Sequence, residues 1–151
     1  MTETPARQLE GFLAKYTPEM VRATRQSLTR MRKLMPGATE LVYDNYNALV
    51  IGFGPGERAS EAVFSIVPFP RWVTLCFLQG RGLADPHGLL KGNGSRVRNI
   101  RLESPATLDR PEVRALLAEA LLNAKRPIDQ GQPRRLIIKS ISAKQRPRRP
   151  S

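Results

Sequence analysis

The chain has 151 residues, enough for one domain with its own core, and 40% of them are hydrophobic, which excludes a wholly disordered protein. A single cysteine excludes an intrachain disulfide, and no apolar run approaches the roughly 18 residues that a membrane-spanning helix needs. Because the first residues also lack the pattern of a signal peptide, we expect a cytoplasmic protein without a membrane partner.

The net charge of +12 is concentrated at the C-terminal end of the chain. Nine of the 25 Lys and Arg residues, against one Asp, follow residue 124, so this end holds +8 of the net charge. The chain up to residue 124 is only mildly basic. A basic tail is a weaker indication of a nucleic-acid-binding fold than a basic stripe on a folded surface.

Two helices are expected before the first strand. Thr4-Pro5 and Thr17-Pro18 each place a capping residue before a proline at the first helical position. Apolar residues then recur at helical spacing, and the second helix should cover residues 18–34. Met35-Pro36-Gly37 ends it.

The next part of the chain is rich in Val, Ile, Leu and aromatic residues, in four short runs at 41–46, 48–53, 62–67 and 72–78. Turn-forming residues separate the runs, which predicts an antiparallel meander. Residues 98–102 alternate between apolar and polar side chains and are expected to form a fifth strand with a polar outer face.

A third helix is expected after Asp109, which has capping-box spacing to Glu112. Apolar residues keep helical spacing up to Ala124, and Lys125-Arg126-Pro127 ends the helix. Residues 136–141 could add an edge strand or a docking segment. The predicted fold is therefore of the α+β class, in two layers, with an antiparallel sheet of about five strands covered by N- and C-terminal helices.

The last ten residues contain Pro, Arg, Lys and Ser but almost no apolar side chains. We interpret residues 1–141 as a single domain and residues 142–151 as a disordered basic tail. The tail cations would attract phosphate weakly and without sequence preference, or would only keep the protein soluble; they are Lys144, Arg146, Arg148 and Arg149.

A glycine turn between the fourth and fifth strands is the main candidate for an anion site. Gly92 and Gly94 expose backbone N–H groups, and cations lie on either side at Lys91, Arg96, Arg98 and Arg101. The alternative is a glycine turn with solvated arginines, which is the commoner arrangement. The turn lacks the Gly-Lys-Ser/Thr ending of a phosphate-binding loop.

Catalytic and metal-binding patterns are scarce. One His and one Cys cannot form a closed metal site, and nothing marks a serine nucleophile beside His87. We therefore expect no cofactor and no catalytic residues, and favour a binding module over an enzyme. Tyr43 and Tyr46 are candidates to line a pocket, although packing alone would also explain tyrosines there.

Three segments together resemble the YdhG-like family of small bacterial domains of unknown function. They are Glu40-Leu41-Val42-Tyr43 at the start of the sheet, Leu89-Leu90-Lys91-Gly92-Asn93-Gly94, and Val97-Arg98-Asn99-Ile100-Arg101-Leu102 before the last helix. The resemblance covers residues 18–124 and implies an α+β fold with an antiparallel sheet covered by helices.

Some members of that family are described as frataxin-like iron chaperones, which gives an alternative function. In this chain such a site would centre on Asp44, Glu57 and Glu61. Iron binding of that type depends on an acidic ridge, whereas the helix at 18–34 carries one acidic residue, Glu19, and five basic ones: Arg22, Arg25, Arg30, Arg32 and Lys33. The sequence therefore favours a non-enzymatic module for an anionic partner, either nucleic acid or another phosphate-bearing ligand.

Overall fold

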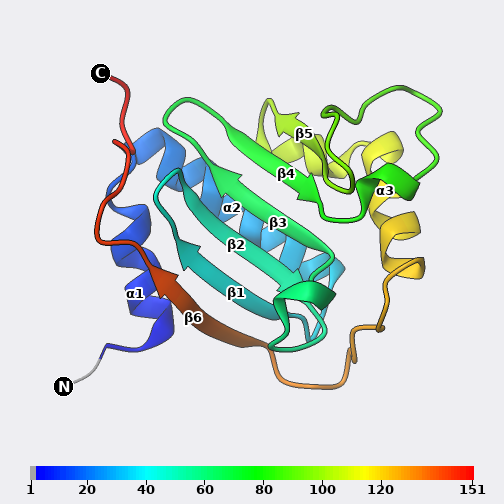
Figure 1. Ribbon diagram of the computed structural model, residues 1–151, viewed down its shortest axis with the longest axis horizontal. Coiled ribbons are helices and arrows are strands. Elements are labelled where there is room, and N and C mark those ends of the chain that lie inside the picture. The colour runs from blue at the N-terminus through cyan, green and yellow to red at the C-terminus, as the bar shows by residue number, and fades with distance from the viewer. Residues whose placement is uncertain (1–2) are drawn as a thin grey trace.

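Residues 3–151 are described by a computed structural model with three α-helices and six strands (Figure 1). The helices are α1 (Pro5–Leu13), α2 (Pro18–Leu34) and α3 (Pro111–Leu122). The strands are β1 (Thr39–Asp44), β2 (Leu49–Gly54), β3 (Phe64–Pro68), β4 (Val73–Phe77), β5 (Arg98–Leu102) and β6 (Arg135–Ile141). Short 3₁₀ turns lie at Ala59–Glu61, Gly80–Gly82 and Pro105–Asp109.

All six strands form one sheet in the order β5-β4-β3-β2-β1-β6. The first five pair antiparallel, as the sequence predicts, and the α+β class is confirmed. The sixth strand is the segment for which the sequence left edge strand and docking segment open. It pairs parallel to β1, with a register shift between Val42 and Tyr43.

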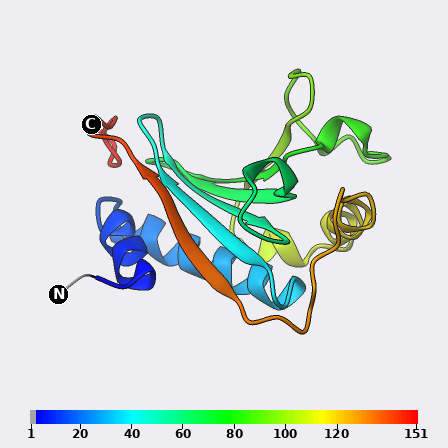
Figure 2. The same ribbon diagram turned by 60° about the horizontal axis from the view of Figure 1, so that its bottom comes forward.

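The helices lie on one side of the sheet, with α2 crossing behind β2 and β3, and no α-helix of residues 3–151 covers the other side (Figures 1 and 2). Successive side chains along each strand therefore point alternately to the helix-covered side and to the other side of the sheet. Leu49, Ile51 and Phe53 of β2 belong to the core, whereas Gly52 between them faces away. One complete rung on the helix-free side runs through Asn99, Cys76, Ser65, Gly52, Leu41 and Ile137.

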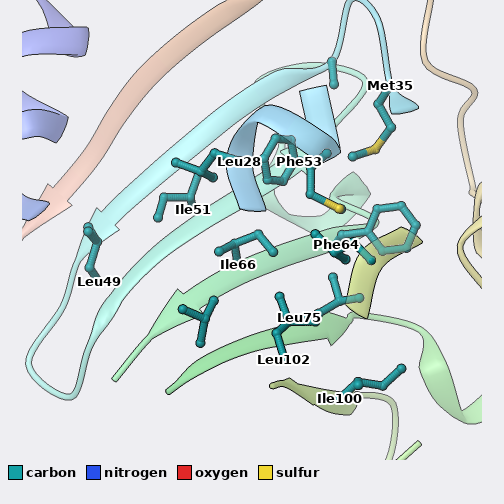
Figure 3. Close-up of a cluster of buried hydrophobic side chains, with 14 of the residues drawn as sticks. Leu28, Met35, Leu49, Ile51, Phe53, Phe64, Ile66, Leu75, Ile100 and Leu102 are labelled. Carbon is teal, nitrogen blue, oxygen red and sulfur yellow. The ribbon is translucent and has the colours of Figure 1, made fainter. Parts of the chain in front are cut away.

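The core forms where the apolar stripe of α2 meets the sheet (Figure 3). Leu28 and Met31 of α2 are almost fully buried, as are Phe64 of β3 and Leu75 of β4. The rings of Phe64 and Phe77 meet edge to face with centroids 5.5 Å apart. This packing holds the sheet rigidly against α2 and thereby fixes the positions of β4 and β5.

Both N-terminal helices begin at the predicted caps. The backbone N–H of Arg7 donates to the Thr4 hydroxyl and that of Met20 to the Thr17 hydroxyl. The capping box predicted at Asp109 is wrong. Arg110 is the capping residue of α3; its side chain makes no capping bond and instead donates to the Glu112 carboxylate at 2.7 Å.

Asp109 does not cap α3 because two arginines occupy its carboxylate. Arg30 of α2 donates to one oxygen at 3.0 Å and Arg114 to the other at 3.2 Å. These ion pairs lower the pKa of Asp109, with the hydrogen bond from Arg30 as the largest cause. The side chain therefore joins α2 to α3 instead of starting a helix.

The predicted disorder of residues 142–151 is also wrong. After β6 the chain crosses the end of β1 and lies beside α1 (Figures 1 and 2). The backbone N–H of Ser142 donates to the Asp44 carbonyl at 2.9 Å, and that of Arg146 to the Tyr46 carbonyl at 2.8 Å. Arg148 is only 5% exposed. This segment therefore packs as part of the domain.

In the described part of the chain, every helix is too short or too polar to cross a membrane.

Candidate anion-binding site

The glycine turn before β5 closes against the free edge of that strand. Lys91 and Asn99 exchange backbone hydrogen bonds of 2.8 and 2.9 Å, and Gly92 adopts a φ of +110° that favours glycine. Because the backbone of Lys91 is tied to Asn99, its side chain starts at the outer edge of the sheet. Lys91 and Arg96 are both exposed.

The four cations expected around this turn do not converge. Arg98 is on the same side of β5 as Ile100 and Leu102, whereas Arg101 is on the helix-free side. The guanidinium of Arg98 donates to the carbonyls of Gly94 and Val97, at 2.7 and 2.8 Å. Its hydrogen-bonding groups thus stabilise the turn, which leaves Lys91, Arg96 and Arg101 as the cations directed to solvent.

Arg101 contacts an aromatic pair that the sequence did not single out. Its guanidinium carbon lies 4.0 Å from the centre of the Trp72 ring, and the Phe69 ring lies beside Trp72 with centroids 5.5 Å apart. The contact follows from the register, because Arg101 pairs with Thr74, two residues after Trp72. The two rings are tilted by 33° to each other, and the three side chains form a cluster that we call the aromatic corner: Phe69, Trp72 and Arg101.

The β3–β4 turn positions this corner. Phe69 donates its N–H to the Trp72 carbonyl at 2.7 Å across the turn Phe69-Pro70-Arg71-Trp72, with proline at the second position. The proline and the two aromatic residues lie close together in the sequence, so the sequence alone could have indicated an aromatic turn here. Only the pairing of β4 with β5 brings Arg101 to them.

A groove of about 510 Å³ opens beside the aromatic corner, between α2 and the ends of β4 and β5. Arg71, Trp72 and Arg101 contribute to its lining from the sheet side. Glu19 and Ser27 from α2, and Glu103 after β5, add polar groups. The groove therefore combines an indole, two guanidinium groups and several hydrogen-bonding side chains.

The cations around β5 have few acidic neighbours in the sequence and form no ion pairs within the described residues. Among residues 3–151, none of the six cations from Arg71 to Arg101 forms an ion pair; they are Arg71, Arg81, Lys91, Arg96, Arg98 and Arg101. Asp85 is the one acidic residue in this stretch of sequence. Its carboxylate accepts from the backbone N–H groups of Leu89 and Leu90, at 2.9 Å each.

The tail cations have different surroundings. Arg148 donates to the Asp44 carboxylate at 2.9 Å and to the Asn45 carbonyl at 2.6 Å. Arg149 donates to the carbonyls of Ala14 and Lys15 at the end of α1. Arg146 lies over the Tyr46 ring at 5.7 Å, and Lys144 is exposed. Arg148, counted as a phosphate-binding candidate from the sequence, is instead a buried structural residue.

Tyr43 and Tyr46 do not lie together. Tyr43 is half-buried in β1 opposite Val50, and burial raises the pKa of its hydroxyl. Tyr46 is 50% exposed in the following turn, where it supports Arg146. The buried tyrosine in this region is Tyr16, whose hydroxyl donates to the Pro68 carbonyl at 3.0 Å.

The acidic residues of the iron-binding alternative are each engaged by cations. Asp44 pairs with Lys15 and Arg148, Glu57 with Arg135, and Glu61 with Arg126. Across residues 3–151, no three His, Cys, Asp or Glu side chains are grouped so that they could hold a metal ion. The geometry therefore offers no acidic ridge at these positions.

Comparisons with protein-family models, with curated proteins and with solved structures find no match to this chain. The resemblance to the YdhG-like family stays a prediction, and the functional argument rests on the geometry around β5.

Proposed function

We propose that the protein is a non-enzymatic module that binds an anionic partner, nucleic acid or another phosphate-bearing ligand, at the β5 end of its sheet. The binding surface consists of exposed cations that we call the β5 patch: Arg71, Lys91, Arg96 and Arg101. Arg98 and the tail cation Arg148 are left out because their guanidinium groups bond to the protein itself.

The observation that carries the proposal is the unpaired charge around β5. Elsewhere in the described residues, 10 of the 19 Lys and Arg residues form ion pairs, as where Glu40 binds both Arg32 and Arg134. Around β5 no cation of the described residues forms an ion pair, and the carboxylate of Asp85 accepts from backbone N–H groups. A cluster of unpaired cations attracts polyanions because binding releases counterions from the phosphates.

The test is binding of a fluorescently labelled oligonucleotide over a salt series, measured by anisotropy. The variant has four substitutions in the β5 patch: R71Q, K91Q, R96Q and R101Q. Its matched control removes four exposed cations on other elements that also form no ion pair within the described residues: R7Q, R22Q, K33Q and R58Q. The two proteins have the same net charge.

We expect the β5 variant to lose most of its affinity while the control binds nearly as the unaltered protein does. If all four cations meet phosphates, the slope of log affinity against log salt should fall by about 3.6 on duplex DNA and about 2.8 on single strands. Equal losses in the two variants would mean that only net charge matters, and the proposed site would be wrong.

No geometric observation favours the iron-chaperone alternative, because each of its three acidic residues is paired with Lys or Arg. We therefore propose a single function.

A further inference from the structure

The aromatic corner adds ring surfaces for stacking to the charges of the β5 patch. Trp72 and Phe69 are half-buried, so part of each ring is accessible at the surface. Both belong to a tight turn, whose internal hydrogen bond holds the backbone in place. Aromatic rings fixed next to cations are the means by which proteins bind unpaired bases.

Arg101 adds an exposed flat group to the two rings. Its planar guanidinium lies 4.0 Å from the centre of the indole, and its side chain is exposed. A guanidinium plane can stack with a base and bond a phosphate. Phe69, Trp72 and Arg101 therefore form a group of neighbouring flat side chains, which we call the ladder, and a base can stack against it.

The polar groups near the ladder suit a nucleotide. Arg71 follows Pro70 in the same turn and lines the groove with Trp72 and Arg101. Glu103, an exposed residue that lines the same groove, can accept from the donor groups on the edge of a base. Lys91 lies opposite Asn99, about 7 Å along the strand from Arg101, and offers a contact for a neighbouring phosphate.

We infer that the aromatic corner binds single-stranded nucleic acid, with a base stacked on the ladder and the flanking phosphates bound by Arg71, Arg101 and Lys91. The inference rests on the proposed function and names its ligand. Duplex DNA or RNA keeps its bases paired and stacked, so it cannot use the ladder and would meet only the cations.

Trp72 is the only tryptophan of the chain, so intrinsic fluorescence reports directly on this corner. The experiment titrates the full chain with a 12-nucleotide oligothymidine, the corresponding duplex, and thymidine monophosphate. We expect saturable quenching with the single strand, little quenching with the duplex, and binding of the mononucleotide that is weaker by tenfold or more.

Substitution then separates stacking from charge. F69L keeps an apolar side chain and the tryptophan reporter but removes one ring, and W72L removes the other, with binding followed by anisotropy. We expect each to weaken single-strand binding about 5- to 150-fold while duplex binding stays within about twofold. The matched control is F12L, which replaces a phenylalanine of α1 and should change neither affinity. Circular dichroism must show that all three variants fold.

Two results would overturn the inference while leaving the proposed function in place. One is binding of single strand and duplex with equal affinity and without quenching. The other is unchanged single-strand affinity in folded F69L and W72L. If the mononucleotide binds as tightly as the 12-mer, the site takes a free nucleotide and the inference is wrong. If no nucleic acid binds, the inference fails and the proposed function is left with small phosphate-bearing ligands alone.

Discussion

Glu40 and Asp44, near the two ends of β1, are fully buried. Arg32 binds Glu40 through two hydrogen bonds, of 2.8 and 2.9 Å, and Arg134 adds a third. Asp44 is bound by Lys15 and Arg148 at 2.8 and 2.9 Å. Since Arg134 and Arg148 flank β6, the two carboxylates tie the C-terminal segment to β1 on either side of that strand.

The first prediction concerns R148M, which removes one cation from Asp44 and leaves an apolar side chain of similar length. Breaking a buried ion pair leaves a poorly compensated charge, so we expect a loss of about 3 kcal/mol in the free energy of unfolding, measured with urea. The matched control is R135M, which breaks the exposed pair with Glu57 and should cost about 1 kcal/mol or less. Similar small losses in both variants would show that the tail is not held by Asp44.

The second prediction is the pH dependence of stability that Asp44 causes. Burial raises the pKa of this carboxyl, but hydrogen bonds from Lys15, Gln145 and Arg148, together with the Lys15 charge, outweigh burial and lower it. A pKa below the unfolded value of about 3.9 means that the stabilisation is present above that pH. It is lost as the pH falls through the folded pKa.

Urea unfolding between pH 6 and pH 2.5 measures this effect. The unaltered protein should lose stability more steeply below pH 4 than D44N, which lacks the titrating group. Parallel curves for the two proteins would contradict the assignment of this pH dependence to Asp44.

At the scale of elements, the turn between α2 and β1 depends on one glycine. Gly37 has a φ of +82°, and its carbonyl accepts a hydrogen bond of 2.7 Å from the Gln132 side chain. A Cβ at Gly37 would collide with the backbone carbonyl oxygen of Asp129. The turn therefore packs directly on the segment that leads from α3 to β6.

The third prediction follows from this contact. G37A should lower the free energy of unfolding by about 1–3 kcal/mol from backbone strain alone, with further loss because residues 129–132 must move. The control is G11A in α1, where a Cβ meets no atom and alanine favours the helix, so stability should hold or rise. Thermal denaturation compares the two, and equal melting temperatures would contradict this role of Gly37.

The helices and the meander could be predicted from the sequence because their signals are local. Thr4 and Thr17 cap the helices that they precede, and the turn residues separate strands that are neighbours in the sheet. The predicted cap at Asp109 failed because Arg30, 79 positions earlier in the chain, bonds to that carboxylate. Local spacing carries no information about such a partner.

The prediction of a disordered tail was wrong, and the contact between Arg101 and Trp72 was missed, for related reasons. Composition predicted disorder after Ile141 because polar residues do not build a core, but Arg148 is buried by its bond to Asp44. Arg101 and Trp72 are separated in sequence by the long irregular loop before β5, so their contact depends on a register that the sequence does not specify. The basic residues around the glycine turn were recognisable, whereas their distribution over two sides of β5 was not.

Over the whole molecule, which has a net charge of +12, some basic residues form ion pairs and others do not. The arginines that contact Glu40, Asp44 and Asp109 hold distant segments together. The unmatched cations around β5 border the helix-free side of the sheet and the groove beside α2. We therefore expect binding at the β4–β5 end of the sheet rather than on the C-terminal tail.

The most direct test is a titration of the ¹⁵N-labelled chain with a 12-nucleotide single strand, followed by amide and indole NMR shifts. We expect the largest changes at residues 69–73 and 91–102, including the indole N–H of Trp72, with small changes at residues 142–149. Changes confined to residues 142–149 and α1 would contradict this expectation and would make the basic tail the binding element.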